Sequence, residues 1–203
     1  MRNLKRVLAL ALALVMTLGL MITASAASYA DADQIDANYN EAIEVLTNMG
    51  VFRGQANGGE STEFAPKDIL TRAEAATLVY RLLTADVTDA KTSNYDYTSF
   101  DDVKEGEWWT GYITYAANGK YVVGYGNGKF GPNDQVTGIE VLTIMLRALG
   151  YGQNGEFVGG GWKDHVVTTA NENGMLKGVA TNDLDKGASR ELVAQLLFNA
   201  ITV

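Results

Sequence analysis

The first candidates for chemistry in this chain are three glutamates that each open an apolar stretch of helical spacing, namely Glu74, Glu140 and Glu191. Paired carboxylates in contrasting environments could serve as general acid and base. Thr71 and Thr137, however, precede the first two glutamates with the S/T-x-x-E spacing of a helix capping box. In the third stretch Ala188 takes the threonine position, unless Ser189 caps a helix whose start is shifted. The spacing therefore favours a structural role for these glutamates.

The chain offers few other groups for catalysis or metal binding. It has no cysteine, which excludes a thiol nucleophile and a cysteine metal site, and His165 is its single histidine. Asp31 and Asp33 have the spacing of calcium-loop ligands, but Ile35 and Ala37 follow at the alternate positions and no ligand glutamate falls in register. We therefore expect no enzyme activity, no cofactor and no metal.

The elements that carry the glutamates belong to a pattern that occurs three times. Each instance is an apolar, helix-like stretch closed by a glycine sixteen positions after its first residue, and the three span 38–54, 108–124 and 162–178. A loop follows each closing glycine, and a second helical run containing the glutamate comes next. Three copies of one supersecondary unit indicate a repeat architecture and favour a binding module over a single active-site fold.

Each repeat is predicted to be a helix, a loop and a second helix. In the first repeat, apolar residues recur at the three- and four-residue spacing of an amphipathic helix up to Gly50, and a second helix is expected from about Arg72 to Leu83. The sequence thus predicts an all-α fold. We place the repeats at 27–85, 95–152 and 157–203, with polar or glycine-rich linkers between them.

The first 26 residues have the form of a secretory signal peptide. Three basic residues precede an apolar stretch over about 7–22, and Ala24-Ser25-Ala26 matches a signal peptidase site. Removing this segment leaves 13 Lys and Arg against 24 Asp and Glu, a net charge of −11. Such an acidic chain disfavours nucleic acid and anionic membranes as partners. We expect a secreted protein with no membrane span after cleavage of the signal.

The repeats also carry motifs in a fixed order. The second reads Phe100-x-Asp102-Val103, Trp108, Ile113, Val122-Val123-Gly124-Tyr125, Gly128-x-Phe130-x-Pro132 and Val136-Thr137-Gly138-Ile139-Glu140. The first contains Leu70-Thr71-Arg72-Ala73-Glu74, and the third keeps Trp162, Gly174, Gly178 and Ser189-Arg190-Glu191. With these motifs the chain resembles the S-layer homology module, which usually occurs as three tandem copies in bacterial surface proteins.

This resemblance implies a pseudo-threefold, all-helical spindle around a central helical bundle, with ligand grooves between neighbouring lobes. It further implies a non-catalytic anchor at the cell wall or cell surface. The expected ligand is secondary cell wall polysaccharide, often bearing pyruvate ketals, and in some members peptidoglycan. The groove residues carried over from the family are Arg72, Asp31 (or Asp33), Gly54, Asp102, Trp108, Gly124, Trp162 and Gly178. A guanidinium can hold a carboxylate, and a tryptophan face can stack on a sugar ring.

The segment Thr71-Arg72-Ala73-Glu74 of the first repeat matches a hallmark of the family, T-R-A-E, and the other two repeats lack its arginine. Gly138 stands at the arginine position of the second repeat and Ser189 at that of the third, with Arg190 one residue further on. One residue along a helix is about 100° of rotation, so only the first repeat is expected to keep its charge partner. If grooves form between neighbours, Arg72 could be completed by Trp108 from the second repeat.

Two other functions are compatible with the sequence. The chain could be a structural surface protein that self-assembles or docks another surface protein. An exported hydrolase would need a pair of carboxylates in opposed environments, which the sequence does not display.

Overall fold

A computed structural model of the chain describes residues 29–54, 62–86, 88–89, 92–95 and 97–203. Within these ranges the structure contains helices and isolated bridges but no strand, so the all-α prediction is confirmed. The helices are α2 (Asn40–Asn48), α3 (Arg72–Thr84), α4 (Thr110–Asn118), α5 (Gly138–Ala148), α6 (Trp162–Glu172) and α7 (Arg190–Thr202). Short 3-10 helices are η1 (Ala32–Gln34), η2 (Ala37–Tyr39), η3 (Thr92–Asn94) and η4 (Thr181–Asp183). The predicted signal peptide and residues 55–61, between α2 and α3, lie outside the described residues.

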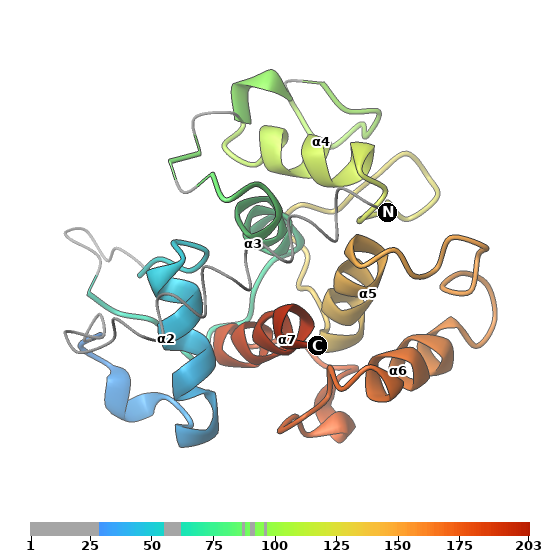
Figure 1. The fold of residues 1–203 in the computed structure, drawn as a ribbon. Helices are drawn as coiled ribbons and strands as arrows, with labels where there is room; N and C mark the ends of the chain where they lie inside the picture. The colour runs from blue at the N-terminus through green and yellow to red at the C-terminus, as the bar shows by residue number, and fades with distance from the viewer. Residues whose placement is uncertain (1–28, 55–61, 87, 90–91, 96) are drawn as a thin grey trace.

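The second helix of each repeat lies in the middle of the molecule. Figure 1 shows α3, α5 and α7 surrounded by α2, α4 and α6. The outer helix α4 packs against α3, α6 packs against α5, and α2 packs against α7. Each outer helix therefore packs against an inner helix contributed by another repeat, and the α2–α7 contact joins the first repeat to the last. The sequence repeat is not the packing unit.

A ring of backbone hydrogen bonds joins the segments that lead into the inner helices. The Leu70 amide donates to the Ala188 carbonyl at 3.0 Å, the Ala188 amide to the Val136 carbonyl at 2.8 Å, and the Val136 amide to the Leu70 carbonyl at 3.0 Å. All three residues are buried, so these polar groups must be paired within the protein. The ring fixes the starts of α3, α5 and α7 relative to one another. Whether a pseudo-threefold rotation relates the three parts stays a prediction.

Side-chain caps determine where the inner helices begin. Thr71 with Glu74 and Thr137 with Glu140 form complete capping boxes, which confirms the structural role expected for these two glutamates. The third inner helix starts differently: the Ser189 hydroxyl accepts from the Leu192 amide at 3.3 Å. A serine oxygen can satisfy this amide and an alanine side chain cannot. Ser189 is therefore the cap of α7, and Ala188 is not at the capping position.

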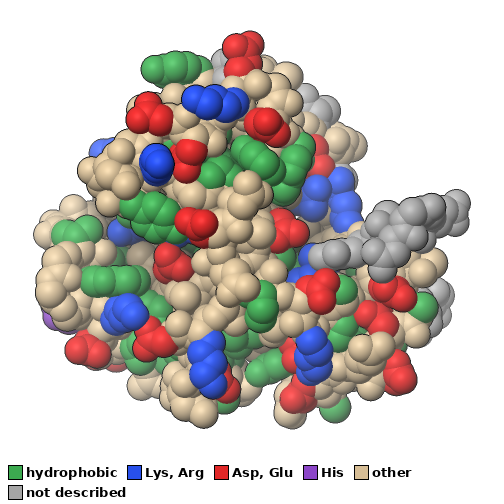
Figure 2. Space-filling model, turned by 180° about the vertical axis from the view of Figure 1, so that it is seen from behind, with side chains coloured by type: hydrophobic (Ala, Val, Ile, Leu, Met, Phe, Trp, Pro, Cys, Tyr) green, Lys and Arg blue, Asp and Glu red, His purple; other side chains and the backbone are tan. Residues whose placement is uncertain are grey.

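Apolar residues from all the described helices form one buried cluster. On the face seen in Figure 2, acidic and basic side chains are interspersed rather than gathered into a patch of one sign. No helix among the described residues is long and apolar enough to span a membrane. The helical starts and this shared core together fix the positions of the loops that line the candidate site.

Candidate functional site

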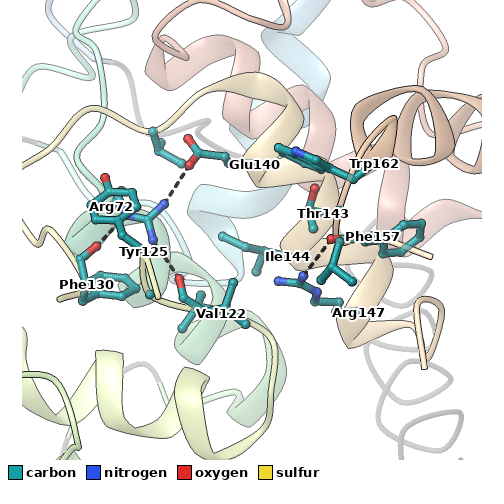
Figure 3. A pocket seen from close by; sticks show the side chains of 15 residues that line it. Arg72, Val122, Tyr125, Phe130, Glu140, Thr143, Ile144, Arg147, Phe157 and Trp162 are labelled. Atoms are coloured by element: carbon teal, nitrogen blue, oxygen red, sulfur yellow. Dashed lines mark hydrogen bonds and ion pairs between the residues drawn. The ribbon is translucent and has the colours of Figure 1, made fainter. Parts of the chain in front are cut away.

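A pocket of about 450 Å³ lies beside α5 and draws its walls from all three repeats. The first repeat contributes Arg72, at the first position of α3. The second contributes the loop residues 122–125 and several side chains of α5, and the third contributes 157–159 and Trp162. Figure 3 shows Arg72 with Tyr125 and Phe130 on one side of the pocket, and Trp162, Phe157 and Arg147 on the other.

Arg72 is held by contacts with the second repeat. It is buried, and its Nε donates to the Phe130 carbonyl at 2.9 Å while Nη2 donates to the Val123 carbonyl at 3.0 Å. Nη1 pairs with Glu140 at 2.8 Å. The guanidinium carbon lies 4.8 Å from the Tyr125 ring centroid and 4.6 Å from that of Phe130. Every guanidinium nitrogen is thus engaged, and Arg72 braces the loop that forms one pocket wall.

Arg190 repeats this arrangement in another part of the molecule. Its Nε donates to the Phe64 carbonyl at 2.7 Å and its Nη2 to the Arg53 carbonyl at 2.9 Å. It lies over the rings of Phe52 and Phe64, and its burial lowers the pKa of its guanidinium. The expectation that Arg190 points away from the hallmark position is wrong, because the Ser189 cap shifts the start of α7 by one residue.

The remaining inner helix, α5, begins with a glycine in place of the arginine, as its sequence indicated. Gly138 occupies the first position of α5, and a Cβ built there would lie 2.9 Å from Leu184 Cδ2. This space is too small for an arginine side chain unless the Leu184 segment moves. Two of the three inner helices therefore start with a buried arginine.

The two predicted aspartates hold loops in place. The Asp102 carboxylate accepts from the amides of Phe130 and Gly131, each at 2.8 Å. Asp31 does the same for Phe64 at 2.8 Å and Ala65 at 2.7 Å. Burial raises the pKa of Asp102, but the two amide donors outweigh it and leave that pKa below its usual range. Neither aspartate lines the pocket, and each positions a phenylalanine on which an arginine stacks.

The predicted glycines lie in different surroundings. Gly124 lines the pocket, and a Cβ there would lie 2.4 Å from the Lys129 carbonyl oxygen, so the fold itself requires glycine at this position. Gly54 is half-buried and follows Arg53, whose carbonyl accepts from Arg190. Gly178 has a positive φ of 73° and nothing close to the site of a Cβ. Among the three, Gly124 is the one that lines this pocket.

The two predicted tryptophans are separated. Trp162 is half-buried at the start of α6 and lines the pocket. Trp108 is 55% exposed, packs edge-on against Trp109 with ring centroids 5.3 Å apart, and is not among the lining residues. The pocket that contains Arg72 is therefore completed by Trp162, contrary to the expected pairing with Trp108.

Sequence reasoning missed Arg147, which stands in the last turn of α5. Its Nη2 donates to the Phe157 carbonyl at 3.3 Å, and burial lowers the pKa of its guanidinium. Among the described residues it forms no ion pair with a carboxylate. A basic residue at a helix end is common, so the sequence carries no signal that separates Arg147 from an ordinary surface arginine.

The lining groups suit binding better than hydrolysis. Glu140 is the one carboxylate among the described lining residues, and it is already paired with Arg72. A glycosidase needs two carboxyl groups that flank the scissile bond. Within the described residues there is also no cluster of side chains that could hold a metal ion. Apolar walls with a few fixed polar groups are typical of a ligand-binding pocket.

Comparison with known proteins gives two kinds of match. A sequence model of the S-layer homology domain matches residues 28–76 and 99–142. The chain is 32% identical over 180 residues to a middle cell wall protein of Brevibacillus brevis, and 30% identical over 172 residues to a surface layer protein of Brevibacillus choshinensis. These alignments cover 89% and 85% of this chain but only 16% and 14% of the relatives.

An enzyme is also among the relatives. The chain is 32% identical over 108 residues to an amylopullulanase of Thermoanaerobacterium thermosulfurigenes, an alignment that covers 53% of this chain and 5% of the enzyme. The chain thus matches a small part of proteins with very different names. The matches place the protein at the cell surface or in the cell wall.

Proposed function

From the two segments that match the S-layer homology domain, we propose that this chain is a non-catalytic anchoring module. It binds secondary cell wall polysaccharide non-covalently in a groove between repeats, and so holds itself or an attached partner at the wall. Residues 27–85 and 95–152 form the first two repeats, and 157–203 forms a third. The third is supported by Arg190, which has the same helix position and the same kinds of contact as Arg72.

The observation that carries this proposal is the pocket beside α5. Its apolar residues include Ile144, Phe157 and Trp162, and its polar groups include Arg72 and Arg147. An aromatic ring can cover the apolar face of a sugar, while fixed guanidinium groups bind its polar or acidic substituents. A volume of about 450 Å³ is within the range of pockets for small organic ligands, so it suits one sugar unit of a longer polymer.

The pattern of relatives supports anchoring over catalysis. The matched region is shared between proteins named for the cell wall or surface layer and an enzyme named for its action on polysaccharide. In the enzyme it accounts for 5% of the length. A region that recurs beside such different activities is better suited to positioning a protein than to a particular reaction.

Binding to isolated cell wall sacculi tests the proposal. The protein should sediment with intact sacculi and be lost from sacculi whose secondary polysaccharide has been extracted, because the polymer is the ligand. Equal binding to the extracted sacculi would make peptidoglycan the ligand. No binding to either, together with concentration-dependent sedimentation of the protein alone, would favour self-assembly and contradict the anchoring proposal.

The tryptophans supply a matched pair of variants for this assay. Trp162→Ala should weaken binding to intact sacculi about fivefold, since stacking against a ring contributes about 1 kcal/mol. Trp108→Ala removes the same side chain from an exposed position outside the pocket and should leave binding unchanged. If Trp108→Ala is the variant that loses binding, the sugar stacks at the start of α4 and the pocket is not the site.

A further inference from the structure

Asparagine followed by glycine occurs five times in the chain, at Asn57, Asn118, Asn127, Asn154 and Asn173. This pair is prone to spontaneous loss of the side-chain amide, because glycine places no side chain over its backbone nitrogen. Asn57 lies outside the described residues, and the structure distinguishes the other four. We propose that Asn127 is a deamidation site, and that its conversion alters the loop that forms a wall of the pocket beside α5.

The reaction needs only the protein and water. The Gly128 nitrogen forms a bond to the side-chain amide carbon of Asn127, the Cγ–Nδ2 bond breaks, and the proton of the Gly128 amide leaves with that nitrogen as ammonia. The product is a cyclic imide. Water then opens the ring at either of its carbonyl carbons, which yields aspartate or isoaspartate in place of asparagine.

The reacting groups of the Asn127–Gly128 pair are suitably placed. The attacking Gly128 amide has no acceptor among the described residues, and neither does the departing Nδ2 of Asn127. The Asn127 Oδ1 accepts from the Lys129 amide at 3.2 Å. Negative charge develops on this oxygen during the attack, and an amide donor that already points at it stabilises that charge. Both residues of the pair are exposed, so water can reach the imide.

In the other three described pairs, hydrogen bonds hold at least one reacting group. The amide after Asn118 donates to a carbonyl one helical turn earlier, at 3.0 Å. The Nδ2 of Asn154 donates to the Glu156 carboxylate at 3.0 Å. The Nδ2 of Asn173 donates to the Thr169 carbonyl at 2.8 Å, and the amide that follows is also engaged. Each such bond must break before the attack, which costs about 1 kcal/mol, or about fivefold in rate.

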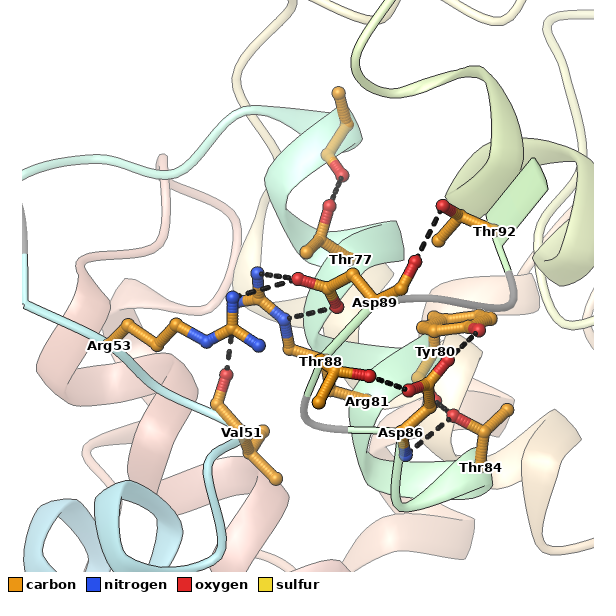
Figure 4. Close-up of polar contacts among 11 residues, drawn as sticks. Val51, Arg53, Thr77, Tyr80, Arg81, Thr84, Asp86, Thr88, Asp89 and Thr92 are labelled. Carbon is orange, nitrogen blue, oxygen red and sulfur yellow. Dashed lines mark hydrogen bonds and ion pairs between the residues drawn. The ribbon is translucent and has the colours of Figure 1, made fainter.

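No side chain of another described residue is hydrogen-bonded to the tip of this loop, residues 126–128. The linker after α3 shows the contrast, since Asp89 in that linker accepts from Arg81 and from Arg53 at 2.8 Å each (Figure 4). The loop tip can therefore reach the conformation in which the backbone nitrogen faces the amide carbon without breaking an ion pair.

The products change the loop in length and in charge. Isoaspartate routes the main chain through the former side chain and adds one carbon, about 1.5 Å, to a loop that the Tyr125–Lys129 backbone hydrogen bond closes at 2.8 Å. Either product also places a carboxylate next to Gly128, where Asp101 already lies, because a Cβ built on Gly128 would be 2.8 Å from Asp101 Oδ2. Like charges in neighbouring positions repel. The conversion should therefore loosen the loop.

The affected loop is the one that Arg72 braces. The Arg72 Nε donates to the Phe130 carbonyl, and Tyr125 and Phe130 both line the pocket (Figure 3). Conversion of Asn127 should therefore lower the stability of the fold and, where the proposed function holds, the affinity for sacculi. Such a change accumulates with time, so it distinguishes older molecules at the cell surface from newly exported ones.

Storage of the whole chain in mildly alkaline buffer tests the proposal. Peptide mapping by mass spectrometry, with enzymatic methylation to detect isoaspartate, gives the rate at each pair. Asn127 should convert at least about fivefold faster than Asn118, Asn154 or Asn173. In concentrated urea the rates should become similar, because the hydrogen bonds are lost. Equal rates in the folded protein, or the same order of rates in urea, would overturn the proposal.

Asn127→Gln provides a blocked form, because the longer side chain closes the ring far more slowly. On storage, the urea midpoint of the original protein should fall as conversion proceeds, whereas that of Asn127→Gln should stay constant. Asn154→Gln, a matched change at an exposed pair whose Nδ2 is held, should give no protection. Circular dichroism of fresh samples would show that both variants are folded. A midpoint that falls equally in Asn127→Gln would overturn the effect assigned to this residue.

Sacculus binding separates this inference from the proposed function. Fresh protein that binds sacculi, with binding lost as Asn127 converts, supports both. Fresh protein that fails to bind contradicts the anchoring function, whereas the conversion at Asn127 is decided by the peptide map alone. Unchanged binding after complete conversion would show that the loop change does not reach the pocket, and would overturn that part of the inference.

Discussion

The buried guanidinium of Arg72 shows how one residue can combine a charge with a structural task. It stacks against Phe130, is hydrogen bonded to two carbonyls of the second repeat and is paired with Glu140. Glu140 in turn completes the capping box of α5. A single side chain thus connects the start of α3 to the loop and the helix of the following repeat. Removing this side chain should therefore lower the stability of the folded protein.

Arg72→Ala is expected to lower the free energy of unfolding by about 3 kcal/mol, because it leaves Glu140 and two carbonyls without their partner. Urea denaturation followed by circular dichroism would measure this. Lys129→Ala, an exposed basic residue in the same loop, provides the control and should change stability by less than about 0.5 kcal/mol. Equal stability of Arg72→Ala and the original protein would contradict the bracing role.

At the scale of secondary structure, the caps decide the register of the inner helices. Thr71 and Thr137 each have a glutamate that completes a capping box, whereas Ser189 acts without one. Glu191 instead accepts from the Asp36 amide at 3.0 Å and pairs with Lys67 at 2.5 Å. It therefore connects α7 to the first repeat. Glutamate therefore caps its own helix in α3 and α5, whereas in α7 it contacts residues far away in the sequence.

Ser189→Ala should destabilise the protein by about 1 kcal/mol, since the Leu192 amide loses its acceptor at the start of α7. The midpoint of urea unfolding would shift accordingly. Ser93→Ala, at an exposed serine of η3, supplies a matched control that should leave the midpoint in place. An unchanged midpoint in Ser189→Ala would mean that the hydroxyl does not cap α7.

At the scale of the whole molecule, the contact between α2 and α7 closes the arrangement. Because each outer helix packs on an inner helix of another repeat, removing one repeat exposes surfaces on the others. The helix α2 buries Ala42, Ile43 and Leu46, and at nine residues it is too short to be stable alone. The first and last parts of the described chain should therefore unfold together.

A chain that ends at Ser189, and so lacks α7, tests this closure. Amide hydrogen exchange in α2 should become as fast as in an unfolded peptide, since the helix has lost the surface against which it packs. The protein lacking only residues 1–26 serves as the reference. Retained protection of α2 in the shortened chain would show that the first repeat folds without the last.

The sequence by itself was sufficient for the all-α class, the positions of the inner helices and two of the three caps. These features depend on interactions between residues a few positions apart, such as Thr71 with Glu74. Local patterns also placed Arg72 and Trp162 among the candidate residues, and both line the pocket.

Only the tertiary structure decided which distant residues meet. Trp162 lines the pocket and Trp108 lies outside it, although each opens the repeated sequence pattern in its repeat. Arg190 stands at the first position of α7, as Arg72 does in α3, and donates to a backbone carbonyl in the same way. This happens because the cap of α7 is one residue later than the alignment of the glutamates indicated. Arg81 and Arg147 have the same helical position, yet only one has an internal carboxylate beside it. Such differences arise from contacts between segments far apart in the chain, which local spacing does not encode.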